Sequence, residues 1–157
     1  MEDISLHILD IVENSIRAHA KKIEIRIIGD KKRDLLNIEI IDDGEGMDEN
    51  TVKNVLDPFF TTRNTRKIGL GLPLLAQSAE ESGGIVRIKS KPGKGTKVKA
   101  TFGYSHIDRR PFGDIGKSLS VLITANPDIN FIYDHKENGT SYHLDTKELK
   151  NDITYNK

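Results

Sequence analysis

Two neighbouring stretches of this chain alternate apolar and polar side chains, and this alternation limits the possible fold more than any other feature. Residues on a β-strand point to opposite faces in turn, so a period of two predicts strands with one apolar and one polar face. The stretches cover residues 22 to 28 and 35 to 41, and the polar link between them predicts a hairpin. The apolar positions are Ile23, Ile25, Ile27, Leu36, Ile38 and Ile40. Because the alternate positions are polar, we expect one side of the sheet to meet water.

Further periodic stretches follow along the chain. Apolar residues about one helical turn apart predict helices, and alternation predicts strands. The expected helices cover residues 4–19, 48–55, 72–81 and 112–125, and the expected strands cover residues 85–90, 96–103, 129–133 and 141–144. Gly83-Gly84 is expected to end the third helix. Asn138-Gly139 is typical of a tight hairpin turn between the last two strands.

The segment after Pro127 is too short to fold alone. About 30 residues follow Pro127, which is fewer than an independent domain needs. We therefore expect residues 1–104 to form one domain and residues 105–157 to form a C-terminal helix and hairpin extension packed on the same core.

Composition excludes several classes of function. Lys plus Arg and Asp plus Glu are equal at 24 each, which argues against nucleic acid or an anionic membrane as the main partner. The absence of cysteine excludes disulfides, thiolate zinc sites and cysteine nucleophiles. No apolar run approaches the ~18 residues of a membrane span. The acidic N-terminus lacks a signal-peptide layout, so we expect a cytoplasmic protein.

The first predicted helix carries a polar edge. Asp10 and Asn14 are four residues apart and share a face, and Arg17 lies close to it. The amide oxygen of Asn14 suits Mg²⁺, which prefers hard oxygen ligands together with phosphate and water. The guanidinium of Arg17 suits a phosphate. A solvated helix face is the alternative interpretation.

Acids and glycines alternate between Asp42 and Met47, directly after the second predicted strand. Glycine permits a positive φ and a close approach of the backbone to a ligand. An acid at the end of the strand can accept a hydrogen bond from an exocyclic amine. A plain acidic turn is the alternative. A calcium loop is excluded because the full run of alternating ligands and its terminal Glu are missing.

Gly69-Leu70-Gly71-Leu72 stands just before the third predicted helix. Backbone N–H groups at a helix N-terminus favour an anion, and Arg63, Arg66 and Lys67 precede them. The motif is neither a Walker loop nor a Rossmann fingerprint, because no Gly-Lys-Ser/Thr follows and no strand leads directly into it. Taken alone, it reads as a tight turn.

In their order and spacing these motifs resemble the GHKL superfamily, which comprises sensor histidine kinases, anti-sigma serine kinases, type II topoisomerases and DNA mismatch-repair ATPases. The resemblance is closest to the histidine-kinase-like ATP-binding domain and covers about residues 4 to 103. It rests on Glu13-Asn14-Ser15-Ile16-Arg17, Asp42-Asp43-Gly44-Glu45-Gly46, Asp57-Pro58-Phe59-Phe60-Thr61-Thr62, Gly69-Leu70-Gly71-Leu72 and Gly95-Thr96. It implies the Bergerat fold, an α+β two-layer sandwich whose mixed, largely antiparallel sheet is covered on one face by helices, here with a C-terminal helix and β-hairpin extension.

The resemblance also implies ATP and Mg²⁺ as cofactors and gives the matched residues roles. Asp42 would accept a hydrogen bond from the adenine amino group with support from Thr96, and Gly44 and Gly46 would leave room for the base. Asn14 would bind Mg²⁺, with Asp10 as a second metal residue. The residues implied for ATP binding are Asn14, Arg17, Asp42, Gly44, Gly46, Met47, Phe60, Arg63, Lys67, Gly69, Leu70, Gly71, Leu72 and Thr96.

The reaction stays open. Hydrolysing branches and anti-sigma kinases place a Glu general base four residues before the asparagine, where this chain has Asp10. Asp is one methylene shorter, and a base needs a reach of about 3 Å, directly or through one water. Arg17 matches a basic position of histidine kinases instead. Three hypotheses follow: a regulatory kinase or slow ATPase acting on an unidentified regulatory partner protein, a non-catalytic ATP-sensing module that signals nucleotide state to a partner, and a detached kinase half that phosphorylates a histidine in trans.

A sensor kinase also needs a phosphoacceptor helix before its ATP domain. We expect a stand-alone domain without one, because the first predicted helix begins almost at Met1. Residues 105–112 resemble a histidine box around His106, but Ile107 replaces the acid that normally follows the histidine. The segment also lies after the ATP domain. We therefore favour a linker that docks the C-terminal helix.

Overall fold

A computed structural model describes residues 4–56, 71–103 and 113–148. Its helices are α1 (Ile4–Arg17), α2 (Glu49–Asn54), α4 (Gly71–Glu81) and α5 (Gly113–Ala125). Its strands are β1 (Lys22–Asp30), β2 (Leu35–Asp42), β3 (Ile85–Lys91), β4 (Gly95–Gly103), β5 (Asn130–Glu137) and β6 (Thr140–Asp145). The predicted elements are confirmed with small shifts at most of their ends, but β5 continues to Glu137 instead of ending at residue 133. The first helix stops at Arg17 rather than residue 19, because His19 takes a left-handed φ of 62°.

The strands form one sheet in the order β3-β4-β2-β1-β5-β6. Four of its neighbouring pairs are antiparallel, and only β1 and β5 run parallel. Parallel neighbours cannot be joined by a tight turn, so β5 must return to the sheet through a crossover, and α5 precedes it. The mixed, largely antiparallel sheet predicted from the sequence is therefore confirmed.

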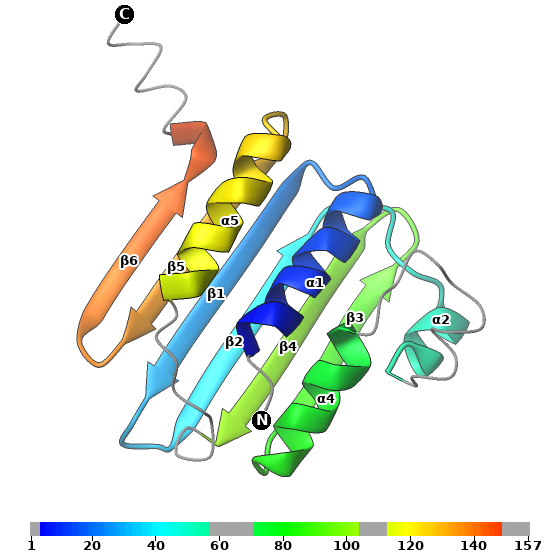
Figure 1. The fold of residues 1–157 in the computed structure, drawn as a ribbon. Coiled ribbons are helices and arrows are strands. Elements are labelled where there is room, and N and C mark those ends of the chain that lie inside the picture. Colours follow the sequence, from blue (N-terminus) through cyan, green and yellow to red (C-terminus); the bar gives the residue numbers. More distant parts are fainter. Residues whose placement is uncertain (1–3, 57–70, 104–112, 149–157) are drawn as a thin grey trace, which may run out of the picture.

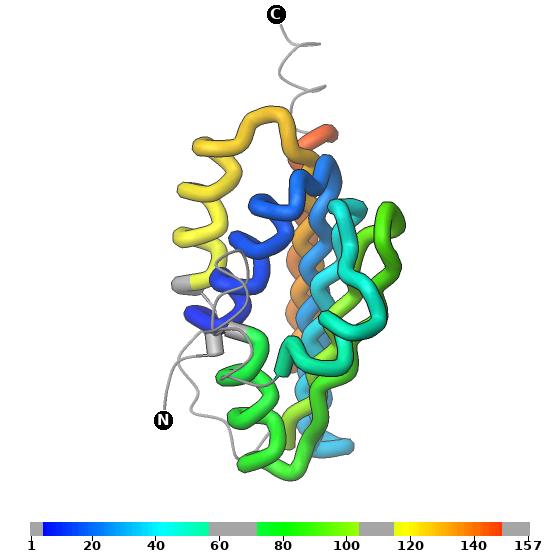
Figure 2. Tube along the Cα trace, turned by 90° about the vertical axis from the view of Figure 1, so that its right-hand side faces the viewer, coloured from blue at the N-terminus to red at the C-terminus, as the bar shows by residue number. Residues whose placement is uncertain are grey.

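Helices α1, α4 and α5 cover one face of the sheet, as Figure 1 shows from the front and Figure 2 from the side. Helix α2 lies beside β3 at the sheet edge (Figure 1). The isoleucines predicted to be inward are 0–1 % exposed and lie under the helices, and burying each contributes roughly 2 kcal/mol. In the described segments the opposite face carries no helix. No described helix is both long and apolar enough to cross a membrane.

The C-terminal elements share this core. Phe131 of β5 is fully buried opposite Ile23 of β1, and Ile115 and Leu119 of α5 belong to the same buried cluster. The predicted turn at Asn138-Gly139 has φ values of 52° and 80°, as a tight hairpin turn requires. The proposed boundary between residues 104 and 105 lies outside the described residues.

Candidate functional site

A cavity of about 260 Å³ lies between α1, the ends of β2 and β4, and the turn that follows β2. This is slightly below the usual range of small-ligand pockets, which is roughly 300 to 1,000 Å³. Its apolar walls are Ile11, Ile40, Met47, Leu72 and Val98, and its polar lining includes Asn14, Ser15, Arg17, Asp42 and Thr96. Mostly apolar walls with a few polar groups suit a planar ring held by its edge.

Asp42 is the last residue of β2, and its carboxylate is fixed from two sides. Ser15 Oγ donates a hydrogen bond to Asp42 Oδ2 at 2.6 Å, and the backbone N–H of Gly44 donates to Oδ1 at 2.9 Å. Ser15 is only 3 % exposed. Its oxygen also lies 3.4 Å from the carbonyl of Ile11, but its single proton serves the shorter contact with Asp42. The carboxylate thus has a set orientation toward the cavity, where it can accept from an exocyclic amine.

The two glycines after Asp42 allow close backbone contacts. A Cβ on Gly44 would lie 2.7 Å from the carbonyl oxygen of Ala18, and one on Gly46 would lie 2.0 Å from that of Lys91. Gly46 also has a φ of 73°, which favours glycine. The turn is thereby clamped between the end of α1 and the β3–β4 turn. This packing role was not predicted, and the role of leaving room for a base stays a prediction.

Asn14 and Arg17 lie about one turn apart on α1 and both line the cavity. Arg17 Nη2 donates a hydrogen bond to Asn14 Oδ1, the oxygen predicted to bind Mg²⁺. Asp10 lies one turn before Asn14, is partly buried and is not among the residues that line the cavity. The structure therefore brings Asn14 and Arg17 to the cavity and places Asp10 further along the helix.

Thr96 faces Asp42 across the β2–β4 register and lines the cavity. Its hydroxyl lies 2.8 Å from Ser90 Oγ, which accepts from the Met47 backbone N–H at 2.8 Å and donates to the Gly95 carbonyl at 2.9 Å. Ser90 thus joins β3, β4 and the turn after β2. The predicted support of Asp42 by Thr96 stays a prediction.

Ser15 and Ser90 were not predicted as site residues. Each is a polar residue on an apolar face: Ser15 lies about one turn after Ile11 and Val12, and Ser90 follows Val86 and Ile88 at inward positions of β3. A hydroxyl at such a position needs a partner, because an unpaired buried polar group is costly. That mismatch was the available signal.

The predicted phosphate end lies mostly outside the described residues. These positions are Phe60, Arg63, Lys67, Gly69 and Leu70. Gly71 is the first residue of α4, and Leu72 is buried at the cavity wall.

Asp48 and Thr51 line the cavity at the start of α2. The backbone N–H of Thr51 donates to the Asp48 carboxylate at 2.7 Å, which caps α2 and lowers the pKa of that carboxyl.

Comparison with known proteins decides the family. The model of the family described as histidine kinase-, DNA gyrase B-, and HSP90-like ATPases matches residues 2–106. The chain belongs to this ATPase family. The family inferred from the sequence motifs is therefore confirmed, and the chain carries an ATP-binding domain of the histidine-kinase-like kind.

Relatives of this ATPase domain include the sensor protein DegM of Bacillus sp. (strain B21-2), 36% identical over 91 residues, which are 58% of this chain and 24% of that protein. Sensor histidine kinase YxdK of Bacillus subtilis (strain 168) is 32% identical over 99 residues, 59% of this chain and 30% of that protein. The chain thus spans less than a third of either relative.

The solved structures add support for the fold alone. A crystal structure of the N-terminal domain of a DNA repair protein is similar over 92% of this chain and 53% of that chain, with a TM-score of 0.66 and 19% identity. The structural similarity covers 92% of the chain, which is more than the residues 2–106 that the family model matches. It therefore includes part of the C-terminal extension.

Proposed function

We propose that this chain binds Mg-ATP in the cavity and acts on a partner protein as a regulatory kinase or slow ATPase. The observation that carries this proposal is that Asn14, Arg17 and Asp42 line one cavity with otherwise mostly apolar walls. The adenine would lie between those walls with its amino group toward Asp42, and its phosphates would extend toward Asn14 and Arg17. A cytoplasmic location, where ATP is abundant, is part of the proposal.

The donor set supports magnesium as the metal. Asn14 offers one neutral oxygen, and within the described segments no group of three or more His, Cys, Asp or Glu side chains could hold a metal. Mg²⁺ fits such a site, because it is usually held by one or two protein oxygens together with phosphates and water. Arg17 contacts the same oxygen, so it would have to turn away. A phosphate is a suitable new partner for its guanidinium.

An ATP-sensing module is the second candidate, and the position of Asp10 favours it. Asp10 is the candidate general base, but it does not line the cavity. A base must reach the water or hydroxyl that it activates, directly or through one water. If Asp10 does not reach, the chain would bind ATP without turnover and report nucleotide state to its partner.

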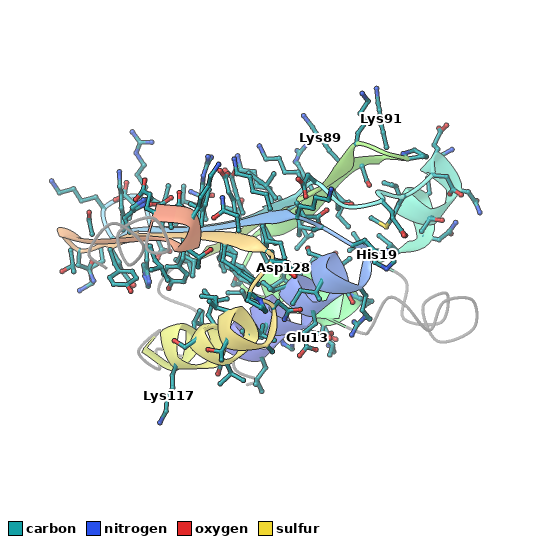
Figure 3. The ribbon with its side chains drawn as sticks, turned by 90° about the horizontal axis from the view of Figure 1, so that it is seen from above. Glu13, His19, Lys89, Lys91, Lys117 and Asp128 are labelled. Atoms are coloured by element: carbon teal, nitrogen blue, oxygen red, sulfur yellow. The ribbon has the colours of Figure 1, made fainter. Side chains whose placement is uncertain are left out.

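The two candidates are separated by removing one carboxylate at a time from α1. Asp10→Asn removes the candidate base, and Glu13→Gln is the matched control, because Glu13 is exposed on the side of α1 away from the sheet (Figure 3). A kinase or ATPase predicts that Asp10→Asn lowers ATP turnover about 100-fold or more with unchanged affinity, and that Glu13→Gln retains turnover. If the wild type binds ATP tightly but does not turn it over, whichever partner protein is added, the kinase or ATPase is excluded and the ATP-sensing module is supported.

A further inference from the structure

The hairpin formed by β3 and β4 is strongly basic. Residues 85–103 contain six Lys or Arg residues and no acid, in a chain whose formal net charge is zero. The rest of the chain is therefore acidic overall. The cations are Arg87, Lys89, Lys91, Lys94, Lys97 and Lys99. The hairpin is thus a local concentration of positive charge in a chain that is neutral overall.

Most of these cations share the helix-free face of the sheet. Figure 3 shows Lys89 and Lys91 pointing away from the helices. In the β3–β4 register Arg87 lies directly opposite Lys99, and Lys89 lies directly opposite Lys97. Like charges directly opposite each other destabilise a sheet. The hairpin therefore carries two unfavourable pairs that its fold does not need.

The described residues neutralise little of this charge. Lys97 Nζ lies 3.5 Å from Glu39 Oε2, but Arg26 also approaches that oxygen, at 4.0 Å. For the other five cations of the hairpin, no carboxylate of the described segments lies within ion-pair distance. The face therefore attracts anions from outside the chain.

Protection of the sheet edge explains only part of the pattern. Lysines on an edge strand block pairing with other chains, and β3 is an edge strand. β4 lies between β3 and β2, where no edge needs protection. Edge protection therefore does not account for Lys97 and Lys99 on β4, of which Lys97 also lines a groove beside the hairpin.

A groove of about 660 Å³ lies beside the hairpin, between it and α2. Its apolar lining is formed by Ile41, Val52, Ile88 and Pro92, and four of the hairpin lysines also line it. Its acids are largely engaged: Asp42 is bonded to Ser15 and Gly44, and Glu49 pairs with Lys53 at 3.4 Å. The groove therefore combines an apolar surface with an excess of cations.

We propose that this groove docks an acidic segment of a partner protein that carries an apolar side chain. The lysines bind its carboxylates, and Ile41, which lies directly opposite Lys97 in the β2–β4 register, contacts the apolar group. A nucleic acid fits less well, because no lining residue of the groove is aromatic and bases would have no ring to stack on. This docking does not depend on the proposed ATP chemistry. Asp42 and Thr96 line both the groove and the nucleotide cavity, so the docked segment lies against a shared wall.

The test measures fluorescence anisotropy of a short labelled peptide of alternating Glu and Leu, without nucleotide. The comparison probes are the same peptide with Gln in place of Glu and a single-stranded DNA of equal charge. The wild type should bind the acidic peptide most tightly, and added salt should weaken binding. Lys89→Glu with Lys91→Glu should lower affinity about tenfold or more, because attractions become repulsions.

The control variant is Lys32→Glu with Lys117→Glu, which changes net charge equally at exposed sites outside the groove; Lys117 lies on the helix side in Figure 3. It should bind like the wild type. The melting temperature of the groove variant should not fall, since Lys89→Glu replaces a like-charge pair with Lys97 by an opposite-charge pair. The proposal is overturned if the wild type does not bind the acidic peptide, if both variants bind it equally, or if the Gln peptide or the DNA binds as tightly. Failure would leave the nucleotide proposal untouched, because no nucleotide is present.

Discussion

Ser15 Oγ lies 2.6 Å from Asp42 Oδ2, and this hydrogen bond ties the first helix to the acid at the end of β2. Hydrogen bonds to a carboxylate are shorter and stronger than neutral ones. Ser15 directly follows Asn14 in the chain. The segment that carries the proposed metal residue therefore also orients the proposed adenine residue, so the two ends of the nucleotide site are coupled through α1.

Ser15→Ala should weaken adenine nucleotide binding about tenfold, or roughly 1.4 kcal/mol, because Asp42 keeps only the Gly44 N–H as its donor. Isothermal titration calorimetry measures this directly. Ser120→Ala is the matched control: the Ser120 hydroxyl donates to the Gly116 backbone carbonyl at 2.8 Å, on an exposed position of α5 outside the cavity. Equal affinity in both variants would show that Ser15 does not orient Asp42.

Gly46→Ala should destabilise the fold much more than Gly93→Ala. Both glycines have a left-handed φ, 73° and 77°, so both substitutions carry a backbone strain of about 1–2 kcal/mol. Only at Gly46 would the new Cβ meet a backbone atom, the Lys91 carbonyl oxygen at 2.0 Å, whereas nothing lies within 4 Å at Gly93. Urea denaturation should show the difference. Similar losses would mean that the turn after β2 is not clamped as described.

The extension should unfold together with the rest of the chain. Phe131 of β5 is fully buried against β1, so Phe131→Ala should lower the free energy of unfolding by about 3–5 kcal/mol. Circular dichroism in urea should show a single transition for both proteins. Two transitions, of which Phe131→Ala shifts one and leaves the other unchanged, would show that the extension folds separately from the core.

The ion pair between His143 and Asp134 predicts a pH effect. His143 Nδ1 lies 2.5 Å from Asp134 Oδ1, and this hydrogen bond, aided by the charge of Asp134, raises the pKa of His143. Because the folded state favours the protonated imidazole, the pair stabilises the fold fully below the ordinary histidine pKa of about 6.5. That stabilisation is lost as the pH rises through the raised pKa.

Asp134→Asn should therefore lower the pKa of His143 in an NMR titration. Asp128→Asn is the control, since Asp128 is an exposed carboxylate in the loop before β5, labelled in Figure 3. If the pKa of His143 stayed the same in Asp134→Asn, Asp134 would not be its main partner.

Local sequence patterns predicted the helices and strands well, because the formation of a helix or strand depends largely on residues that are close in the sequence. The alternation around Ile25 and Ile38 determines which face is buried, and both are buried under the helices. The parallel pairing of β5 with β1 could not be predicted, because the period of a sequence pattern identifies a strand but does not determine which other strand pairs with it. The site shows the same limit: Ser15 meets a residue 27 positions away, and Ser90 meets Met47 across 43 positions.

The predictions for Phe60, Arg63, Lys67, Gly69 and Leu70 rest on the sequence and the family resemblance, because these residues lie outside the described part of the chain. The adenine end rests on geometry as well. It is therefore the part of the site where an experiment bears most directly on the structure.

The most direct test of the central claim is a thermal-shift titration with Mg-ATP on the wild type, Asp42→Asn and the control Asp128→Asn. A ligand that binds only the folded state raises the melting temperature. We predict a rise of roughly 5 to 10 °C for the wild type and the control at about 100 times the Kd, and little or none for Asp42→Asn. No rise in the wild type, or an equal rise in Asp42→Asn, would contradict ATP binding in this cavity.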